Sequence, residues 1–194
     1  LLALAFSDKT QICIASEQTQ GKGQYDRAWL SQKDASILFS IRYVFRADLS
    51  LNGLSLVIGL AIADALEELG IKQIKLKWPN DVFFDNKKLA GILIENSVQG
   101  EYQSVVIGLG LNYDLNQKFE CQSPWVDLVS IIPKLPAIEN LAALLINHIL
   151  KNCQLFESHD LSYFIQSWEQ VDYLKNTRVK LDINNQTFAG IVKG

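Results

Sequence analysis

Apolar and β-branched residues gather in short runs along the first part of the chain, and polar residues separate these runs. Runs of this length, bounded by turn-forming residues, predict strands. We expect strands at residues 10–15, 36–45, 74–78, 82–84, 89–96 and 104–111. The run at residues 10–15 is β-branched and apolar at most positions, so this strand is predicted to be buried. Asp85 and Asn86 separate two of the runs and predict a hairpin turn.

Longer segments repeat their apolar residues at the spacing of an α-helix. Residues 55–69 form one such segment, which stops at Gly70, a residue type that commonly follows a helix C-terminus. Residues 138–156 predict a second long helix, and residues 161–170 predict a shorter one. The chain is therefore expected to contain two long helices and one short helix.

The last part of the chain changes character. From Thr177 onward, two short apolar runs flank Asn184 and Asn185, a pair that strongly favours a hairpin turn. Hairpins are thus mixed with long helices and do not alternate regularly with them. This pattern predicts an α+β fold, with a mixed β-sheet flanked by helices.

The composition narrows the class of protein. The chain has 194 residues, of which 48% are hydrophobic and 20% charged, which is typical of one globular domain or slightly more and excludes extensive disorder. The formal net charge is −3 and no block of Lys and Arg stands out, so we expect no nucleic-acid partner for these residues. No apolar run reaches the roughly 18 residues of a membrane-spanning helix, so no membrane partner is expected.

The cysteines suggest a cellular compartment and no metal site. Cys13, Cys121 and Cys153 do not have the close spacing of zinc ligands. Cys13 lies inside an apolar run and is expected in the core. An odd number of scattered cysteines is typical of the reducing cytoplasm, where we expect this protein.

A glycine-rich loop is the first candidate for chemistry. Residues 18–29 hold Gly21 and Gly23 on either side of Lys22, and Arg27 follows. Glycines let backbone N–H groups approach an anion, and the two cations supply counter-charge. The order of residues matches neither the Walker phosphate loop nor the dinucleotide-binding glycine motif, so a flexible basic surface loop is the alternative.

The sequence K-W-P-N-D at residues 77–81 is the second candidate. Asn and Asp after a proline commonly form a plain turn, which is one interpretation. In the functional interpretation, Asn80 offers an amide to a ligand, Asp81 holds Mg²⁺, and Lys88 faces an anion. A carboxylate and an amine this close suit a site that handles a magnesium nucleotide and a carboxylate together.

Two glycines inside a predicted strand form the third candidate. The sequence V-I-G-L-G-L-N at residues 106–112 places Gly108 and Gly110 in the strand and Asn112 at its end. Glycine inside a strand fits either a flat ligand lying against the backbone or close packing between strands. This segment alone does not decide between the two.

Taken in order, five motifs resemble the catalytic domain of the biotin–protein ligases. They are Q-x-x-G-[KR]-G at residues 18–23, S-x-x-G-L-x-L-x-x-G at 50–59, K-W-P-N-D at 77–81, K-L-A-G-I-L-x-E at 88–95 and V-I-G-x-G-x-N at 106–112. The related lipoate ligases carry an R-R-x-S-G-G-G signature, which this sequence lacks. The resemblance implies the biotin/lipoate ligase fold, which is similar to that of class II synthetases.

The resemblance also suggests how the chain is divided. Residues 168–180 (WEQVDYLKNTRVK) resemble the junction with the small SH3-like C-terminal domain of the family. We therefore expect a catalytic domain at residues 1–174 and the start of an SH3-like β domain at residues 175–194. The S-T-N motif that precedes the first motif in the family is absent, so we expect the catalytic domain to be incomplete at its N-terminus.

Family members join biotin to ATP, releasing pyrophosphate and forming biotinyl-5′-AMP. They then pass biotin to a lysine of a biotin carboxyl carrier protein, such as that of acetyl-CoA carboxylase. The resemblance therefore implies biotin and ATP with Mg²⁺ as ligands, and the carrier domain as partner.

The motifs also imply site residues. The implied biotin-binding residues are Gln18, Gly21, Lys22, Gly23, Gln24, Lys88, Gly91 and Gly108. The implied ATP-binding residues are Lys22, Gln24, Arg27, Asn80, Lys88, Asn112 and Trp125. The implied catalytic residues are Lys88, Lys22 and Arg27, and Asp81 is the implied Mg²⁺ ligand.

The glycine-rich loop departs from the family pattern G-R-G-R-x-G-R. Lys22, Gln24 and Asp26 stand where the pattern has Arg, Arg and Gly. A neutral Gln24 cannot pair with a phosphate as an arginine fork does, so we expect the adenylate to be retained less tightly.

Other functions of this fold stay open at this point. One is a lipoate or octanoate ligase or transferase. Another is a biotin-responsive transcriptional repressor, which would need a DNA-binding segment upstream of Leu1. Homodimerisation through an exposed strand edge is a further question that these residues do not decide.

Overall fold

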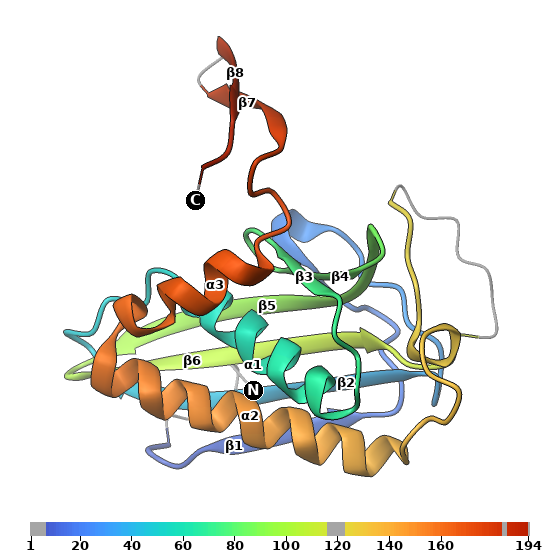
Figure 1. Cartoon of the computed structure of the whole chain (residues 1–194). Coiled ribbons are helices and arrows are strands. Elements are labelled where there is room, and N and C mark those ends of the chain that lie inside the picture. Colours follow the sequence, from blue (N-terminus) through green and yellow to red (C-terminus); the bar gives the residue numbers. More distant parts are fainter. Residues whose placement is uncertain (1–6, 116–122, 184–185, 194) are drawn as a thin grey trace.

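The computed structural model describes residues 7–115, 123–183 and 186–193. Its centre is a six-stranded sheet with the strand order β1-β2-β6-β5-β4-β3 (Figure 1). The strands are β1 (Gln11–Ala15), β2 (Ser36–Arg46), β3 (Ile74–Lys77), β4 (Asp81–Phe84), β5 (Lys87–Gln99) and β6 (Tyr102–Asn112). The predicted strands are thus confirmed, with small shifts at their ends.

The pairing of these strands corrects one detail of the prediction. All neighbouring strands of the sheet are antiparallel, whereas a mixed sheet was expected. The described residues pair in parallel only at two isolated bridges, Leu76 with Asp172 and Lys88 with Trp125. Short connections, such as the turns between β3, β4, β5 and β6, allow only antiparallel neighbours. The α+β class itself is confirmed.

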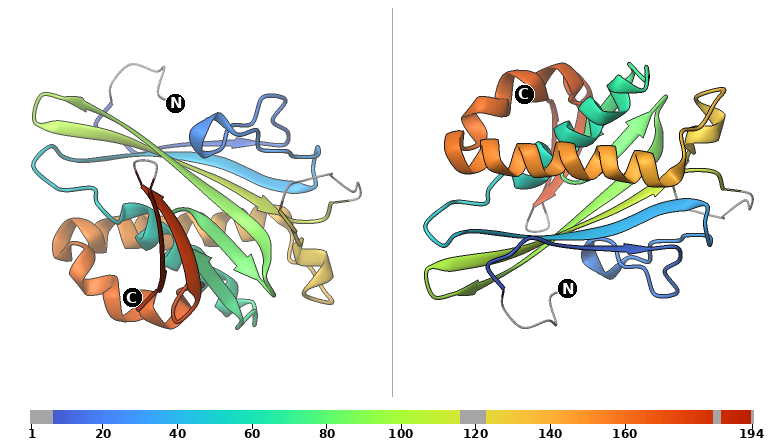
Figure 2. Two further views of the ribbon diagram at one scale, coloured as in Figure 1. Left: turned by 90° about the horizontal axis from the view of Figure 1, so that it is seen from above. Right: turned by 90° about the horizontal axis from the view of Figure 1, so that it is seen from below.

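Two long helices cover one face of the sheet. They are α1 (Leu54–Glu68) and α2 (Ile138–His159), and their apolar sides pack against inward-facing residues of β2 such as Ile41 and Phe45. Figure 2 shows the helices on one side of the sheet and the loop between β1 and β2 on the opposite side. That second face, called the open face below, carries the candidate site. No helix in the described ranges combines the length and the apolar character needed to cross a lipid bilayer.

The predicted third helix forms in two parts. A 3₁₀ turn, η3 (Leu161–Phe164), leads into the short helix α3 (Ile165–Val171). Two further 3₁₀ turns, η1 (Gln24–Asp26) and η2 (Leu128–Ser130), lie in the loops after β1 and β6.

The predicted hairpin between β4 and β5 is confirmed. Asp85 and Asn86 have φ angles of 47° and 60°, in the left-handed region. Both positions of a two-residue hairpin turn need this conformation when the turn is to follow the twist of its strands, and Asn and Asp tolerate it better than other side chains.

The prediction for β1 is partly wrong. The strand forms, but it is the edge of the sheet and is not buried: Ile12 and Ile14 are 44% and 61% exposed, and Cys13 is exposed as well. The reason is topological, because β1 pairs only with β2 and the core under the helices begins at β2. Cys121 lies outside the described residues.

The two described cysteines should differ sharply in reactivity. Burial, assisted by the carboxylate of Glu157, raises the pKa of the Cys153 thiol to about 12, so at mildly alkaline pH it stays protonated and unreactive. We expect iodoacetamide to alkylate Cys13 in the folded protein and to reach Cys153 only after unfolding, as measured by peptide mass spectrometry. Equal alkylation of both residues in the folded protein would contradict the core packing described here.

Beyond α3 the chain forms a separate two-stranded hairpin. Its strands, β7 (Arg178–Ile183) and β8 (Gln186–Ile191), pair antiparallel as predicted and project away from the main sheet (Figure 1). The expected turn at Asn184 and Asn185 lies outside the described residues. An SH3-like domain and the boundary between residues 174 and 175 stay predictions.

Candidate active site

Glycines from neighbouring strands meet on the open face of the sheet. Gly110 of β6 lies opposite Gly91 of β5, and Gly108 of β6 lies opposite Ser40 of β2 and Leu93 of β5. Residues directly opposite one another in an antiparallel sheet point to the same face. The centre of the open face is therefore a glycine strip without side chains of its own, which a flat group can approach closely.

A β-bulge directs Lys88 to this strip. Val82 pairs with Ala90 but the next residue, Phe83, pairs with Lys88, so Leu89 is an extra residue in β5. Leu89 and Ala90 are consecutive and both lie in the core. Without the extra residue, strict alternation would place Lys88 on the core face; with it, Lys88 shares the open face with Gly91.

Lys88 forms an ion pair with Asp81 at the start of β4. The Lys88 Nζ and Asp81 Oδ1 atoms are 2.6 Å apart, and about three quarters of each side chain is buried, with exposed fractions of 28% and 25%. The same amine lies 5.4 Å from the ring centre of Trp29. The carboxylate and the indole together fix the position of the charged group over the glycine strip.

The loop between β1 and β2 closes over this region. The Trp29 N–H donates to the Gly21 carbonyl at 2.8 Å, and the Gly23 N–H donates to the Arg27 carbonyl at 2.7 Å. A Cβ atom at Gly21 would lie 2.6 Å from the Trp29 carbonyl oxygen, so the close backbone approach requires glycine there.

Trp29 is the loop residue that lies against the strip. A Cβ atom at Gly110 would lie 2.6 Å from Trp29 Nε1, and one at Gly91 would lie 2.9 Å from Trp29 Cζ3. At Gly108 a Cβ atom would be no closer than 3.5 Å to any described neighbour. Gly91 and Gly110 are therefore glycines because the indole covers them, while protein packing alone does not require glycine at Gly108.

A cavity of about 730 Å³ lies between the loop and the sheet. This is within the roughly 300–1,000 Å³ usual for small-molecule sites. Most of the predicted site residues line it: Gln18, Lys22, Gly23, Gln24, Arg27, Asn80, Asp81, Lys88, Gly91, Gly108, Asn112 and Trp125. Gly21 is not among the lining residues, and its packing against Trp29 accounts for it instead. The assigned roles of these residues stay predictions.

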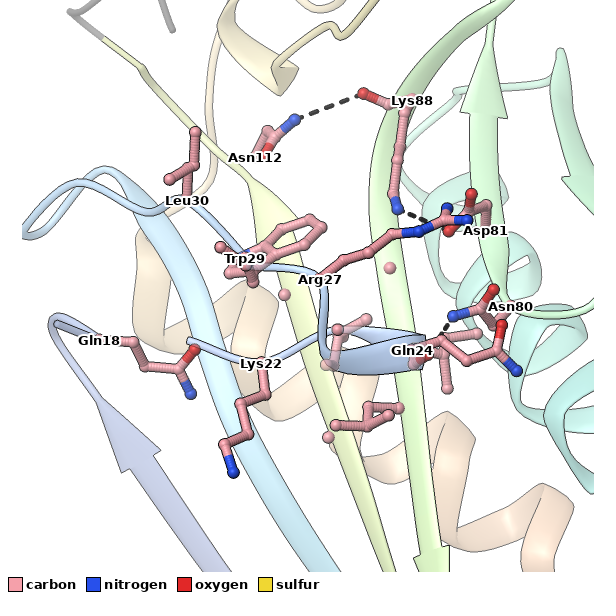
Figure 3. A pocket seen from close by; sticks show the side chains of 18 of the residues that line it. Gln18, Lys22, Gln24, Arg27, Trp29, Leu30, Asn80, Asp81, Lys88 and Asn112 are labelled. Carbon is pink, nitrogen blue, oxygen red and sulfur yellow. Dashed lines mark hydrogen bonds and ion pairs between the residues drawn. The ribbon is translucent and has the colours of Figure 1, made fainter. Parts of the chain in front are cut away.

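The cations of the site point in different directions. In Figure 3 the guanidinium of Arg27 reaches toward the Lys88–Asp81 pair, whereas the side chain of Lys22 points away from it, on the side where Gln18 lies. The Arg27 guanidinium also lies 5.9 Å from the ring centre of Tyr25. Lys88 and Arg27 thus form a cationic centre at one part of the cavity, and Lys22 lies toward the other.

Two of the predicted amide ligands also hold the site together. The Asn80 side chain donates to the Ile92 carbonyl at 2.8 Å. The Asn112 side chain donates to the carbonyls of Lys88 and Val126, at 3.3 and 3.0 Å. Asn112 thus uses both amide hydrogens on the backbone and keeps its amide oxygen for a ligand, whereas Asn80 keeps one N–H as well as its oxygen.

The segment with Trp125 is attached directly to Lys88. The Lys88 N–H donates to the Pro124 carbonyl at 2.9 Å, and the Val126 N–H donates to the Lys88 carbonyl at 3.0 Å. A segment far along the chain is thereby placed beside the backbone of Lys88. This attachment brings Trp125 into the lining of the cavity.

Several lining residues were not identified from the sequence. They are Gln20, Ala28, Trp29, Leu30, Phe39, Ser40, Lys77, Phe83, Ile92, Leu93, Glu95, Val106, Leu109, Leu115 and Ser123. For Trp29 a signal existed, because an aromatic residue follows the glycine-rich loop directly. For Ser40 and Leu93, only the register of the strands places them beside Gly108.

Metal binding by protein ligands alone is not supported in the described ranges. They contain no group of three or more His, Cys, Asp or Glu residues able to hold a metal ion. Mg²⁺ bound with a nucleotide needs fewer protein ligands, because it usually keeps several waters and takes one or two carboxylates besides the phosphates. Asp81 lines the cavity, so a carboxylate is present for a nucleotide-bound Mg²⁺.

Comparisons with known proteins show what this chain is similar to. Residues 2–112 match the model of the biotin/lipoate A/B protein ligase family. The chain is 34% identical over 186 residues to the bifunctional ligase/repressor BirA of Escherichia coli, covering 94% of this chain and 58% of that protein. It is 39% identical over 106 residues to the biotin–[acetyl-CoA-carboxylase] ligase of Mycobacterium tuberculosis, covering 52% of this chain and 38% of that protein.

A solved structure is similar over nearly the whole chain. The biotin protein ligase from Aquifex aeolicus in complex with biotin and ATP superimposes with a TM-score of 0.78 at 28% identity, covering 92% of this chain and 75% of that one. The chain spans a little more than half the length of the BirA proteins that it matches. Because the family model matches more than half of the residues, this chain belongs to the biotin/lipoate A/B protein ligase family.

Proposed function

We propose that this protein is an ATP-dependent biotin ligase, which forms biotinyl-5′-AMP and transfers biotin to a lysine of a biotin carboxyl carrier protein. The observation that carries the proposal is the Lys88–Asp81 pair beside the glycine strip, where Gly108 stays uncovered, with Arg27 directed toward the pair. The similarity to ligases named for biotin supports the choice of substrate.

The two ligands have complementary places in the cavity. The strip around Gly108 and Ser40, with Gln18 at its side, suits the flat, neutral ring system of biotin. Its carboxylate then extends toward Lys88. The aromatic Trp125, which is attached beside Lys88, suits the adenine ring of ATP.

In the first step an oxygen of the biotin carboxylate bonds to the α-phosphorus of ATP. The bond from that phosphorus to the bridging oxygen breaks, and pyrophosphate leaves with the electron pair. Both reactants are anionic, and two like charges about 4 Å apart repel by about 4 kcal/mol at an effective dielectric constant near 20. Lys88 and Arg27 offset this repulsion and stabilise the charge that develops on the leaving group.

Mg²⁺ bound with ATP would be held by the phosphates and by Asp81, and would neutralise further phosphate charge. Asp81 also orients the Lys88 amine through their ion pair. In the second step the neutral amine of the acceptor lysine attacks the acyl carbon, the acyl C–O bond breaks so that AMP leaves with its electron pair, and the new amide nitrogen releases a proton to solvent. The loop at residues 16–30 covers the site, which limits hydrolysis of the reactive anhydride.

The test is biotin-dependent exchange of radiolabelled pyrophosphate into ATP, followed by transfer of biotin to a purified carrier domain. We expect both activities, and binding of biotin but not lipoate or octanoate in calorimetric titrations. If exchange depends on lipoate or octanoate instead, that acid and not biotin is the substrate of the ligase. No exchange with any of these acids would contradict ligase activity.

Gln24 is expected to weaken retention of the adenylate. It lines the cavity near Asn80 but carries no charge to pair with a phosphate. We expect Gln24→Arg to slow the dissociation of biotinyl-5′-AMP by about 10-fold, since one charged hydrogen bond contributes about 1.5 kcal/mol or more. A filter-binding measurement of the off-rate checks this. Gln20→Arg, which changes another lining glutamine, is the matched control, and an unchanged off-rate in Gln24→Arg contradicts the prediction.

A further inference from the structure

Lys77 lies on the open face of the sheet, in β3, the outer edge strand beyond the glycine strip. The register places Lys77 opposite Asp81, Asp81 opposite Gly91, and Gly91 opposite Gly110. These four residues therefore form one row across the open face. Neighbouring strands are about 4.8 Å apart, so Lys77 lies about 10 Å from Gly91 along this row. It also lines the cavity.

The amine of Lys77 is held by aromatic rings and not by a carboxylate. Its Nζ lies 5.5 Å from the ring centre of Phe83 and 5.9 Å from that of Tyr173. The two rings are themselves in contact, with centres 5.0 Å apart. Among the described residues no carboxylate lies within 4 Å of this amine, whereas the amine of Lys88 is paired with Asp81. An aromatic face orients a cation without neutralising it, so the charge stays available to an anion.

Tyr173 reaches this position because the chain after α3 returns to the sheet. The Tyr173 N–H donates to the Leu76 carbonyl at 2.9 Å, and Asp172 forms a parallel bridge with Leu76. The Lys75 amine holds the same segment through the Gln170 carbonyl at 2.9 Å. Leu76, the residue before Lys77, thus holds this segment by its backbone. This attachment fixes the Tyr173 ring against Phe83.

The direction of adenylyl transfer determines on which side of the α-phosphorus pyrophosphate leaves, and therefore which cations can bind it. In an in-line displacement the leaving oxygen departs on the side opposite the attacking oxygen. With biotin over Gly108 and Lys88 at the α-phosphorus, the carboxylate attacks from the β6 side. Across the sheet, β4 and β3 lie on the opposite side of β5 from Gly108, so the component of departure that crosses the strands carries pyrophosphate toward Lys77, which lies on the same face.

We infer that Lys77, positioned by Phe83 and Tyr173, binds the leaving pyrophosphate of the adenylation step. The inference rests on the proposed function and adds a residue to it. Lys77 contacts the substrate directly, while Tyr173 acts through Lys77 as a positioning residue. The segment after α3 thereby sets the affinity of the site for the triphosphate of ATP.

The test measures the binding of inorganic pyrophosphate, with Mg²⁺ present, by equilibrium dialysis, together with the KM for pyrophosphate in the exchange reaction. We expect Lys77→Gln to weaken both by about 10-fold and to leave biotin affinity, measured by calorimetry, within about 2-fold. Tyr173→Leu should weaken pyrophosphate binding by about 3-fold, and Tyr173→Phe, which keeps the ring, should restore it. Lys72→Gln changes an exposed lysine outside β3 and is the matched control.

Pyrophosphate binding that Lys77→Gln leaves unchanged would overturn the inference, as would an equal loss in Lys72→Gln or a parallel loss of biotin affinity. Failure of Tyr173→Phe to restore binding would remove the positioning role of the ring. Dialysis needs no turnover, so this result is independent of the proposed function. If the wild-type protein binds pyrophosphate through Lys77 but shows no biotin-dependent exchange, the proposed ligase activity is contradicted. The inference that Lys77 binds pyrophosphate would still hold.

Discussion

Lys88→Ala is expected to abolish the first half-reaction while the protein stays folded. The Lys88 amine lies over the glycine strip, where the proposed function places the biotin carboxylate and the α-phosphate. Removing one group that stabilises developing negative charge typically costs 10²- to 10³-fold in rate, or about 3–4 kcal/mol. We expect biotin-dependent pyrophosphate exchange to fall by about 10³-fold.

The neighbouring residue provides the control for this experiment. Lys87 is exposed, belongs to the same strand, and does not line the cavity. Lys87→Ala removes the same charge one residue away, so exchange should stay within about 2-fold of wild type. Thermal unfolding of both variants shows whether the fold is intact. Exchange by a folded Lys88→Ala protein at close to the wild-type rate would remove Lys88 from the mechanism.

Gly108→Ala is expected to impair biotin binding without loss of stability. A Cβ atom at this position would have ordinary contacts, the nearest being the Leu93 carbonyl oxygen at 3.5 Å, and would project into the cavity. Alanine is tolerated in the strand and restricts the unfolded chain more than glycine does, so the free energy of unfolding should stay equal or rise slightly. Because the added methyl group occupies the floor on which biotin is placed, we expect biotin affinity to fall by at least about 10-fold in calorimetry.

Gly110→Ala is the informative contrast. Its Cβ atom would overlap the Trp29 indole, so the ring or the backbone has to move, and we expect a loss of about 1–3 kcal/mol in the free energy of unfolding. The two variants thus separate a glycine required by the protein from a glycine required by the ligand. Unchanged biotin affinity in Gly108→Ala would move the biotin site away from this strip.

Local features of the sequence predicted much of the fold. The Asp85-Asn86 turn needs left-handed backbone, which these residue types tolerate, so the hairpin could be identified from two residues. The long helices follow from apolar spacing alone. The candidate site was found through motifs, and most of its predicted residues do line one cavity.

What the sequence could not predict depends on distant contacts. Whether the apolar β1 is buried depends on its edge position in the sheet, which the residues of β1 do not encode. The direction of Lys88 depends on the bulge at Leu89, which exists only once β4 and β5 pair. The ring system around Lys77 needs Tyr173, nearly a hundred residues later in the chain.

The central claim is that this cavity joins the carboxylate of biotin to the α-phosphorus of ATP. A single-turnover reaction with biotin labelled with ¹⁸O in its carboxylate tests it directly, using the purified carrier domain as acceptor and mass spectrometry of the AMP released. If the carboxylate attacks the α-phosphorus, breaking the acyl C–O bond in the second step leaves one labelled oxygen on AMP. AMP without label, or label found in pyrophosphate or phosphate, would contradict the account.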